Sequence, residues 1–174
     1  MEFERKYVAF SEDNEIIGAA MQGFVSTITI ADIDDLLKRH HMDDIQLDQW
    51  YPMQPMLDLF SELEQHPTAM TDFVAIGMKA AEVFPYPPEV STIGQVMQTL
   101  PANHEAVHRN GDIGSVAAEQ LGERHWRVTY RAPHPPDVIY GIIYGLARRF
   151  APPENDLIVR REIDGFTSMI DITW

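Results

Sequence analysis

An apolar helix of about 15 residues is the feature that most constrains the fold of this chain. Pro136 begins it, because proline is favoured in the first turn, and apolar residues then occur on every face up to Phe150. Such a helix must be covered on all sides, yet it is shorter than the roughly 20 residues that span a bilayer. We therefore expect a central buried helix over 136–150. Gly141 and Gly145 lie four residues apart, so one face can lie directly against a sheet or another helix.

Alternating apolar and polar residues predict a β-hairpin on each side of this helix. The first hairpin covers 115–131, with its turn near Gly122. The second covers 156–173, and Asp164-Gly165 within it is the strongest short hairpin signal in the chain. Together they predict a four-stranded antiparallel sheet.

Helical patterns dominate the first part of the chain. The predicted helices begin near Thr29 and Ile30, at Pro55, at Pro67 and at Ser91, and the last of them is expected to falter near Pro101. The stretch from Glu15 to Ile28 has no clean period. The sequence thus predicts an α+β fold: a single ligand-binding-like domain with a helical half, 1–110, packed on a ββαββ half, 111–174.

Composition excludes several classes of function. Thirteen Lys and Arg against 27 Asp and Glu give a net charge of −14, which disfavours nucleic acid as a partner. The absence of cysteine excludes disulfides and thiolate metal sites. The charged start, Met1–Phe10, does not resemble a signal peptide, so we expect a cytoplasmic protein with no membrane span.

The sharpest catalytic motif match is His104-Glu105-Ala106-Val107-His108, which has the H-E-x-x-H spacing of zinc hydrolases. On an unbroken helix it would place two imidazoles on one face, with the glutamate ready to activate metal-bound water. We expect Pro101 to interrupt this helix, and the family's third ligand position is Gly114. We therefore predict no stoichiometric zinc, and a zinc-dependent hydrolase stays open as an alternative.

The segment from Trp126 to Trp174 resembles a known family. It reads WRVTYRAPHPPDVIYGIIYGLARRF and continues into the second hairpin. This order resembles the C-terminal half of the haem-based nitric-oxide-binding (H-NOX) domains, and it is similar to the 4-vinyl-reductase ligand-binding domains and their eukaryotic vesicle-transport relatives. The resemblance implies a sensory or signalling domain that binds a small molecule or a partner protein and is often a dimer.

The resemblance does not carry over the haem site. H-NOX domains hold the haem propionates with a Tyr-x-Ser-x-Arg motif, and the matching positions here are Tyr130, Ala132 and His134. Charge-assisted hydrogen bonds of this kind contribute about 1.5–3 kcal/mol each, and only the tyrosine is kept. His104 or His108 could stand for the axial ligand, although neither spacing to Tyr130 fits the family. We expect no cofactor, with haem as the alternative.

A ligand site is expected between the helix that precedes the first hairpin and the hairpin itself. Trp126, Val128 and Tyr130 share one face of their strand, so rings and polar groups could line a pocket there. The predicted site residues are His104, His108, Trp126, Tyr130, His134 and Tyr140. The alternative is that these rings pack together and leave no space.

Three classes of function therefore remain. The first is a non-catalytic domain that binds a small apolar or anionic molecule. The second is a hydrolase using His104, Glu105 and His108. The third is a dimeric module that binds a signalling partner protein.

Overall fold

The computed structural model describes residues 3–28 and 32–174. Its helices are α1 (Gly18–Val25), α2 (Ile33–Arg39), α3 (Gln54–Leu63), α4 (Ala69–Val83), α5 (Ile93–Val107) and α6 (Pro136–Arg149). Its strands are β1 (Glu15–Ile17), β2 (Trp50–Pro52), β3 (His108–Arg109), β4 (Ser115–Gly122), β5 (His125–Arg131), β6 (Ile158–Asp164) and β7 (Thr167–Thr173). The predicted α+β class is confirmed.

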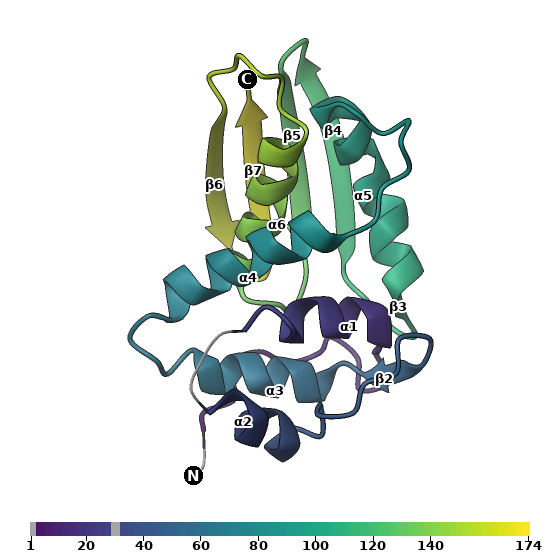
Figure 1. The fold of residues 1–174 in the computed structure, drawn as a ribbon, viewed down its shortest axis with the longest axis vertical. Coiled ribbons are helices and arrows are strands. Elements are labelled where there is room, and N and C mark those ends of the chain that lie inside the picture. The colour runs from purple at the N-terminus through teal and green to yellow at the C-terminus, as the bar shows by residue number, and fades with distance from the viewer. Residues whose placement is uncertain (1–2, 29–31) are drawn as a thin grey trace.

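Both predicted hairpins form, and they join into one antiparallel sheet of order β4-β5-β7-β6. Strand β5 pairs with β7 from His125 opposite Thr173 to Arg131 opposite Thr167. Helices α5 and α6 lie on one face of this sheet, and α1, α2 and α3 gather at its lower end (Figure 1). The sheet half is therefore built as the alternating patterns predict.

A second, smaller sheet of order β2-β1-β3 has no counterpart in the prediction. It brings Ile16 opposite both Tyr51 and His108, which are far apart in the sequence. Strands of two or three residues carry too little alternation to be recognised from sequence. This small sheet fixes the end of α5 beside the start of α1.

The core consists of two apolar clusters. The first gathers α1, α3 and the first half of α4, with Phe60 and Phe73 fully buried. The second gathers α5, α6 and the inner face of the sheet, with Ile143 and Ile170 fully buried. Helices α4 and α6 contribute to both clusters, so their crossing joins the two.

Glycine makes that crossing possible. A Cβ atom on Gly77 of α4 would lie 2.2 Å from the carbonyl oxygen of Val138, and one on Gly141 of α6 would lie 2.3 Å from that of Val74. Side chains larger than hydrogen cannot fit at such distances. The predicted close approach of the central helix is therefore to another helix, α4.

Two predicted boundaries need correction. Helix α5 does not falter near Pro101 but runs on to Val107, because its buried face, including Met97 and Leu100, packs against the sheet and offsets the missing hydrogen bond. Its N-cap is Thr92, whose hydroxyl accepts from the Gln95 amide, and not Ser91. The predicted helix start at Thr29 and Ile30 lies outside the described residues.

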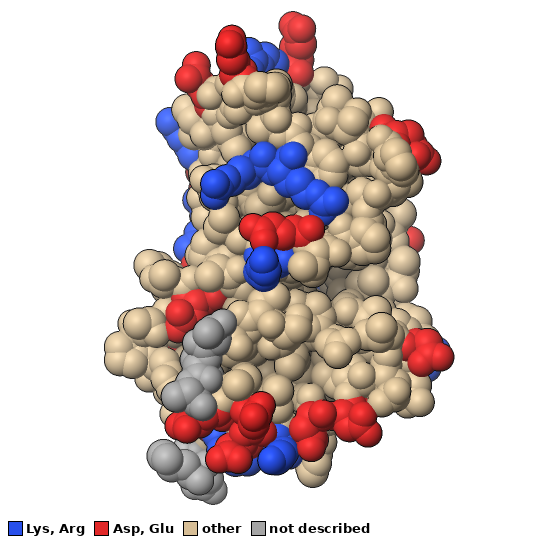
Figure 2. Space-filling view, viewed as in Figure 1, with Lys and Arg blue, Asp and Glu red and all other residues tan. Residues whose placement is uncertain are grey.

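The surface charge is uneven. Figure 2 shows acidic side chains gathered at the lower end of the molecule, near α2 and α3, and an arc of basic side chains higher up, over the sheet half. None of the helices in the described ranges has the length and apolar character needed to cross a membrane.

The glycine contact predicts a specific loss of stability. Gly141→Ala should lower the free energy of unfolding by about 1–3 kcal/mol, because the new methyl group must push the backbone of α4 away. Gly23→Ala in α1 is the matched control: a Cβ there meets nothing within 4 Å, so the change should stabilise by roughly 0.5–1 kcal/mol. Urea unfolding checks both, and equal effects of the two substitutions would contradict the close crossing.

Candidate functional site

Three buried histidines meet where the two apolar clusters join. His104 is the twelfth residue of α5, His108 follows the end of that helix and begins β3, and His134 lies in the turn between β5 and α6. Their side chains are 4%, 5% and 4% exposed. The ring centroids of His104 and His108 are 4.5 Å apart, and those of His108 and His134 are 5.8 Å apart. We call these three residues the histidine cluster.

His104 is fully hydrogen-bonded. Its Nε2 lies 2.9 Å from the carbonyl oxygen of Ile113, which can only accept, so Nε2 carries the proton. Its Nδ1 is then an acceptor for the hydroxyl of Tyr130, 3.1 Å away. Burial lowers the pKa of His104 and raises that of the Tyr130 hydroxyl, which keeps both groups neutral.

His108 and His134 leave ring nitrogens without partners. His108 Nδ1 donates to the carbonyl oxygen of His104 at 3.0 Å, so Nε2 is an unprotonated acceptor, and no described residue donates to it. Neither nitrogen of His134 has a hydrogen-bond partner in the described ranges, 3–28 and 32–174. An unsatisfied buried polar group lowers the free energy of unfolding by about 1–3 kcal/mol, so these three nitrogens destabilise the folded chain.

The residues around His134 explain why its ring is buried. Pro133 and Pro135 flank it and restrict the backbone of the turn. Its ring lies 5.9 Å from that of Phe24 and 6.4 Å from that of Phe60, measured between centroids. The histidine cluster therefore connects α1 and α3 of the first apolar cluster to α5 and β5 of the second.

Electrostatics keep the histidine cluster uncharged. Burial, reinforced by the neighbouring His104, lowers the pKa of His108 to about 4. Burial also takes the pKa of His134 well below its usual value, with His108 and His104 adding to the effect. The nearest arginine along β5, Arg131, pairs with Asp112 at 2.9 Å and offers no free cation.

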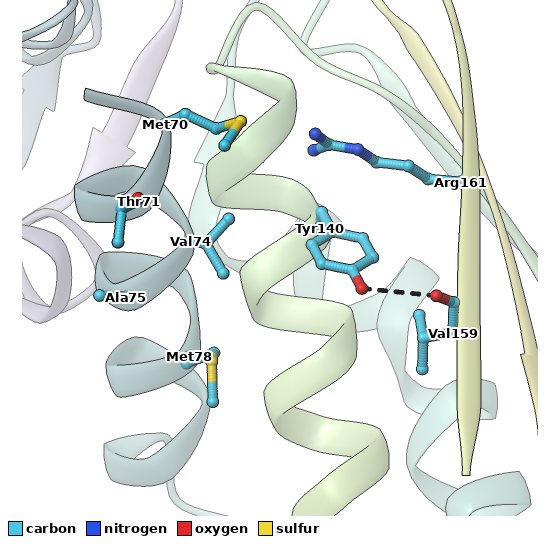
Figure 3. Close-up of a pocket in the computed structure, with 8 residues that line it drawn as sticks. All are labelled: Met70, Thr71, Val74, Ala75, Met78, Tyr140, Val159 and Arg161. Atoms are coloured by element: carbon cyan, nitrogen blue, oxygen red, sulfur yellow. Dashed lines mark hydrogen bonds between the residues drawn. The ribbon is translucent and has the colours of Figure 1, made fainter. Parts of the chain in front are cut away.

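Four of the six predicted site residues come together, and two do not. His104, His108, Tyr130 and His134 form one contact chain. Trp126 lies at the other end of β5 from Tyr130, with its indole beside Gly94 near the start of α5. Tyr140 lines a separate groove against α4 and β6 (Figure 3). Phe24 and Phe60 touch the histidine cluster but were not predicted, since nothing in the sequence distinguishes them from other core rings.

The H-E-x-x-H motif does not assemble as a zinc site. The helix does continue through His104, contrary to expectation, but His108 lies beyond its end with extended backbone, φ −125° and ψ 151°. Glu105 is exposed while both histidines are buried. Within residues 3–28 and 32–174, no three His, Asp or Glu side chains are placed to hold a metal ion.

Solved structures of H-NOX domains match this chain over about nine-tenths of its length. An Fe(II) unliganded H-NOX protein from K. algicida has a TM-score of 0.65 at 10% identity, covering 91% of this chain and 96% of its own. An H-NOX protein from S. oneidensis in the Fe(II)NO ligation state has a TM-score of 0.65 at 10% identity, covering 90% and 98%. An oxygen-binding H-NOX domain related to soluble guanylate cyclases has a TM-score of 0.61 at 13% identity, covering 90% and 91%.

No protein-family model matches the sequence, and no curated protein matches it either. At 10–13% identity the structural likeness establishes the fold. The chemistry of the site must be argued from this chain's own residues.

The buried neutral histidines predict a pH-dependent stability. The unfolded chain binds protons on these histidines near pH 6.5, whereas folded His108 does so only near pH 4. Stability should therefore be complete above about pH 6.5 and fall as the pH drops toward 4, with a slope of up to about 1.4 kcal/mol per pH unit for each such histidine.

Urea unfolding at several pH values checks this prediction. His134→Phe should flatten the slope, because it removes one imidazole that must stay neutral. His66→Phe is the matched control, since His66 is exposed and its loss should leave the slope unchanged. A wild-type chain as stable near pH 5 as near pH 7 would contradict the assignment.

Proposed function

We propose that this chain, which has the fold of H-NOX domains, is a non-catalytic sensory domain that binds a small uncharged molecule at the histidine cluster. One observation carries the proposal: three ring nitrogens of His108 and His134 are buried at the junction of the two apolar clusters without a hydrogen-bond partner among the residues that the structure describes. The helical half, 1–110, and the ββαββ half, 111–174, would act as one unit around this site.

The ligand class follows from the protonation states. His108 Nε2 is a lone-pair acceptor, and neutral His134 offers one donor and one acceptor. A molecule with an O–H or N–H group on a small apolar body would satisfy them. Anions are disfavoured because the imidazoles are neutral and Arg131 is already paired with Asp112.

The arrangement of residues does not suit haem. The rings of Phe60, His134, His108, His104 and Tyr130 follow one another at centroid distances of 4.5–6.4 Å, which leaves no layer for a porphyrin between them. Both nitrogens of His104 are hydrogen-bonded. The positions of the propionate-binding serine and arginine hold Ala132 and His134, which are buried. These observations support a domain without haem.

Binding at this site would act on the junction of the halves. A ligand that bonds to His108 and His134 would have to separate the His134 ring from those of Phe24 and Phe60, which belong to α1 and α3. The free energy that it gains by satisfying buried nitrogens favours the rearranged state over the closed one. Such coupling between a bound molecule and the arrangement of two halves is what a sensor requires.

A thermal-shift comparison of phenol with benzoate tests the ligand class. Phenol should raise the melting temperature, because its hydroxyl can donate to His108 Nε2, and benzoate should not. The shift should disappear in His134→Phe and in Tyr130→Ala, which removes the hydroxyl bonded to His104.

Tyr140→Ala is the matched control, since Tyr140 lies outside the histidine cluster and its loss should leave the phenol shift in place. If phenol raised the melting temperature equally in all variants, it would bind outside the histidine cluster and the proposal would be wrong. Stoichiometric haem uptake with an absorption band that depends on His104 or His108 would overturn the haem-free proposal.

A further inference from the structure

Strand β6 forms an open edge of the four-stranded sheet. Within residues 3–28 and 32–174 it pairs with β7 on one side only, over all seven residues from Ile158 opposite Thr173 to Asp164 opposite Thr167. Ile158 and Ile163 on this strand are 47% and 48% exposed. Natural proteins protect such edges, because unpaired backbone groups beside apolar side chains attract another strand.

The register shows which backbone groups face the open edge. Asp164 and Thr167 close a two-residue turn, so they exchange hydrogen bonds, and alternate residues back to Ile158 are directed toward β7 in the same way. The remaining residues, Val159, Arg161 and Ile163, direct their N–H and C=O groups outward. The carbonyl oxygen of Val159 accordingly accepts from the Tyr140 hydroxyl, at 3.4 Å, and not from β7.

The sequence of β6 is complementary to itself when it is paired antiparallel. If a twofold axis passes beside Arg161, Arg160 lies opposite the partner's Glu162, and Glu162 lies opposite the partner's Arg160. Both side chains are exposed on the outer face of the sheet, and neither forms an ion pair with any described residue. Opposite charges placed directly across a strand pair stabilise it.

The inner face of the same register is apolar on both sides of Arg161. Val159 would lie opposite the partner's Ile163, beside a groove of about 550 Å³ between α4 and β6. Met70, Val74 and Met78 line its other wall, and Figure 3 shows the side chains of Met70 and Val74 directed from α4 toward α6. Flexible methionines adapt to an incoming aliphatic side chain.

Arg161 itself does not oppose this pairing. Its guanidinium lies 2.5 Å from Asp137 and 4.9 Å from the ring centre of Tyr140. Asp137 therefore neutralises the charge of Arg161 on the inner face of the sheet, even though the Arg161 side chains of the two copies would meet at the twofold axis. The backbone N–H of Arg161 would donate to the carbonyl oxygen of the partner's Arg161, and the reverse bond would form as well. Both are possible because the backbone groups of Arg161 point away from β7, toward the open edge.

We propose that two copies of this chain pair through β6, antiparallel and with Arg161 at the twofold axis, to form one continuous eight-stranded sheet. Such an interface is closed, because each copy presents the same strand and receives the same strand. The proposal does not depend on the ligand proposed for the histidine cluster.

Charge-swap variants test the interface by sedimentation or light-scattering mass. The wild-type chain should have twice the mass of a 19.9 kDa monomer. Glu162→Arg places arginine opposite arginine at two positions and should weaken the dimer roughly tenfold or more. Arg160→Glu should do the same, and the double variant Arg160→Glu/Glu162→Arg should restore the dimer.

Mixing the two single variants should also give a dimer that contains one copy of each. Glu123→Arg is the control, an equal charge change in the turn between β4 and β5, and it should leave the mass unchanged. Circular dichroism shows that each variant is folded, and either single variant suffices if the other fails to fold. A monomeric wild type, a dimer that resists both single changes, or a double variant that stays monomeric would overturn the proposal.

Discussion

The backbone contact between α4 and α6 is the constraint on which the arrangement of the two apolar clusters depends. Gly77 and Gly141 remove the side chains that would hold the helices apart, so each helix can contribute to both apolar clusters. Phe73 and Val138 face the first cluster, whereas Ala81 and Ile143 face the second. Without this approach the chain would consist of two small cores, each with too little buried surface to be stable by itself.

The crossing also determines where the polar groups of the core meet. Helix α6 begins directly after the turn that carries His134, so fixing α6 on α4 brings that ring against Phe24 and Phe60. The small sheet fixes His108 from the other side. A neutral imidazole network with unpaired nitrogens at such a junction costs stability in the closed state. The same residues thus give rise to both the predicted pH dependence of stability and the proposed binding.

The sequence predicted those helices and strands in which apolar residues recur with a clear helical or alternating period. Both hairpins, the central helix and the role of its glycines follow from spacing that can be read in the sequence, and the resemblance of Trp126–Trp174 to H-NOX domains agrees with the structural matches. The failures have a common cause. Helix α5 continues through Pro101, and β1 pairs with β3, because of contacts between residues that are distant in the sequence.

The candidate site was predictable only as a set of residue types. Shared strand faces suggested Tyr130 with Trp126, but the length of β5 separates them, and the direction of α6 turns Tyr140 toward β6. The ring contacts from Tyr130 through His104 and His108 to His134 form because α5 ends just before His108. No local sequence pattern predicts that end. For the same reason, the self-complementarity of β6 became visible only once the strand order showed that β6 is an edge.

The central claim is that the junction is closed by neutral imidazoles in defined tautomers. Long-range ¹H–¹⁵N NMR correlation of the histidine rings tests it most directly, because it reports the protonation of each nitrogen. The account predicts that His104 carries its proton on Nε2 and His108 on Nδ1 at neutral pH, and that His108 stays neutral until about pH 4. Protonation of His108 near pH 6.5, or rapid exchange between its tautomers, would contradict the account.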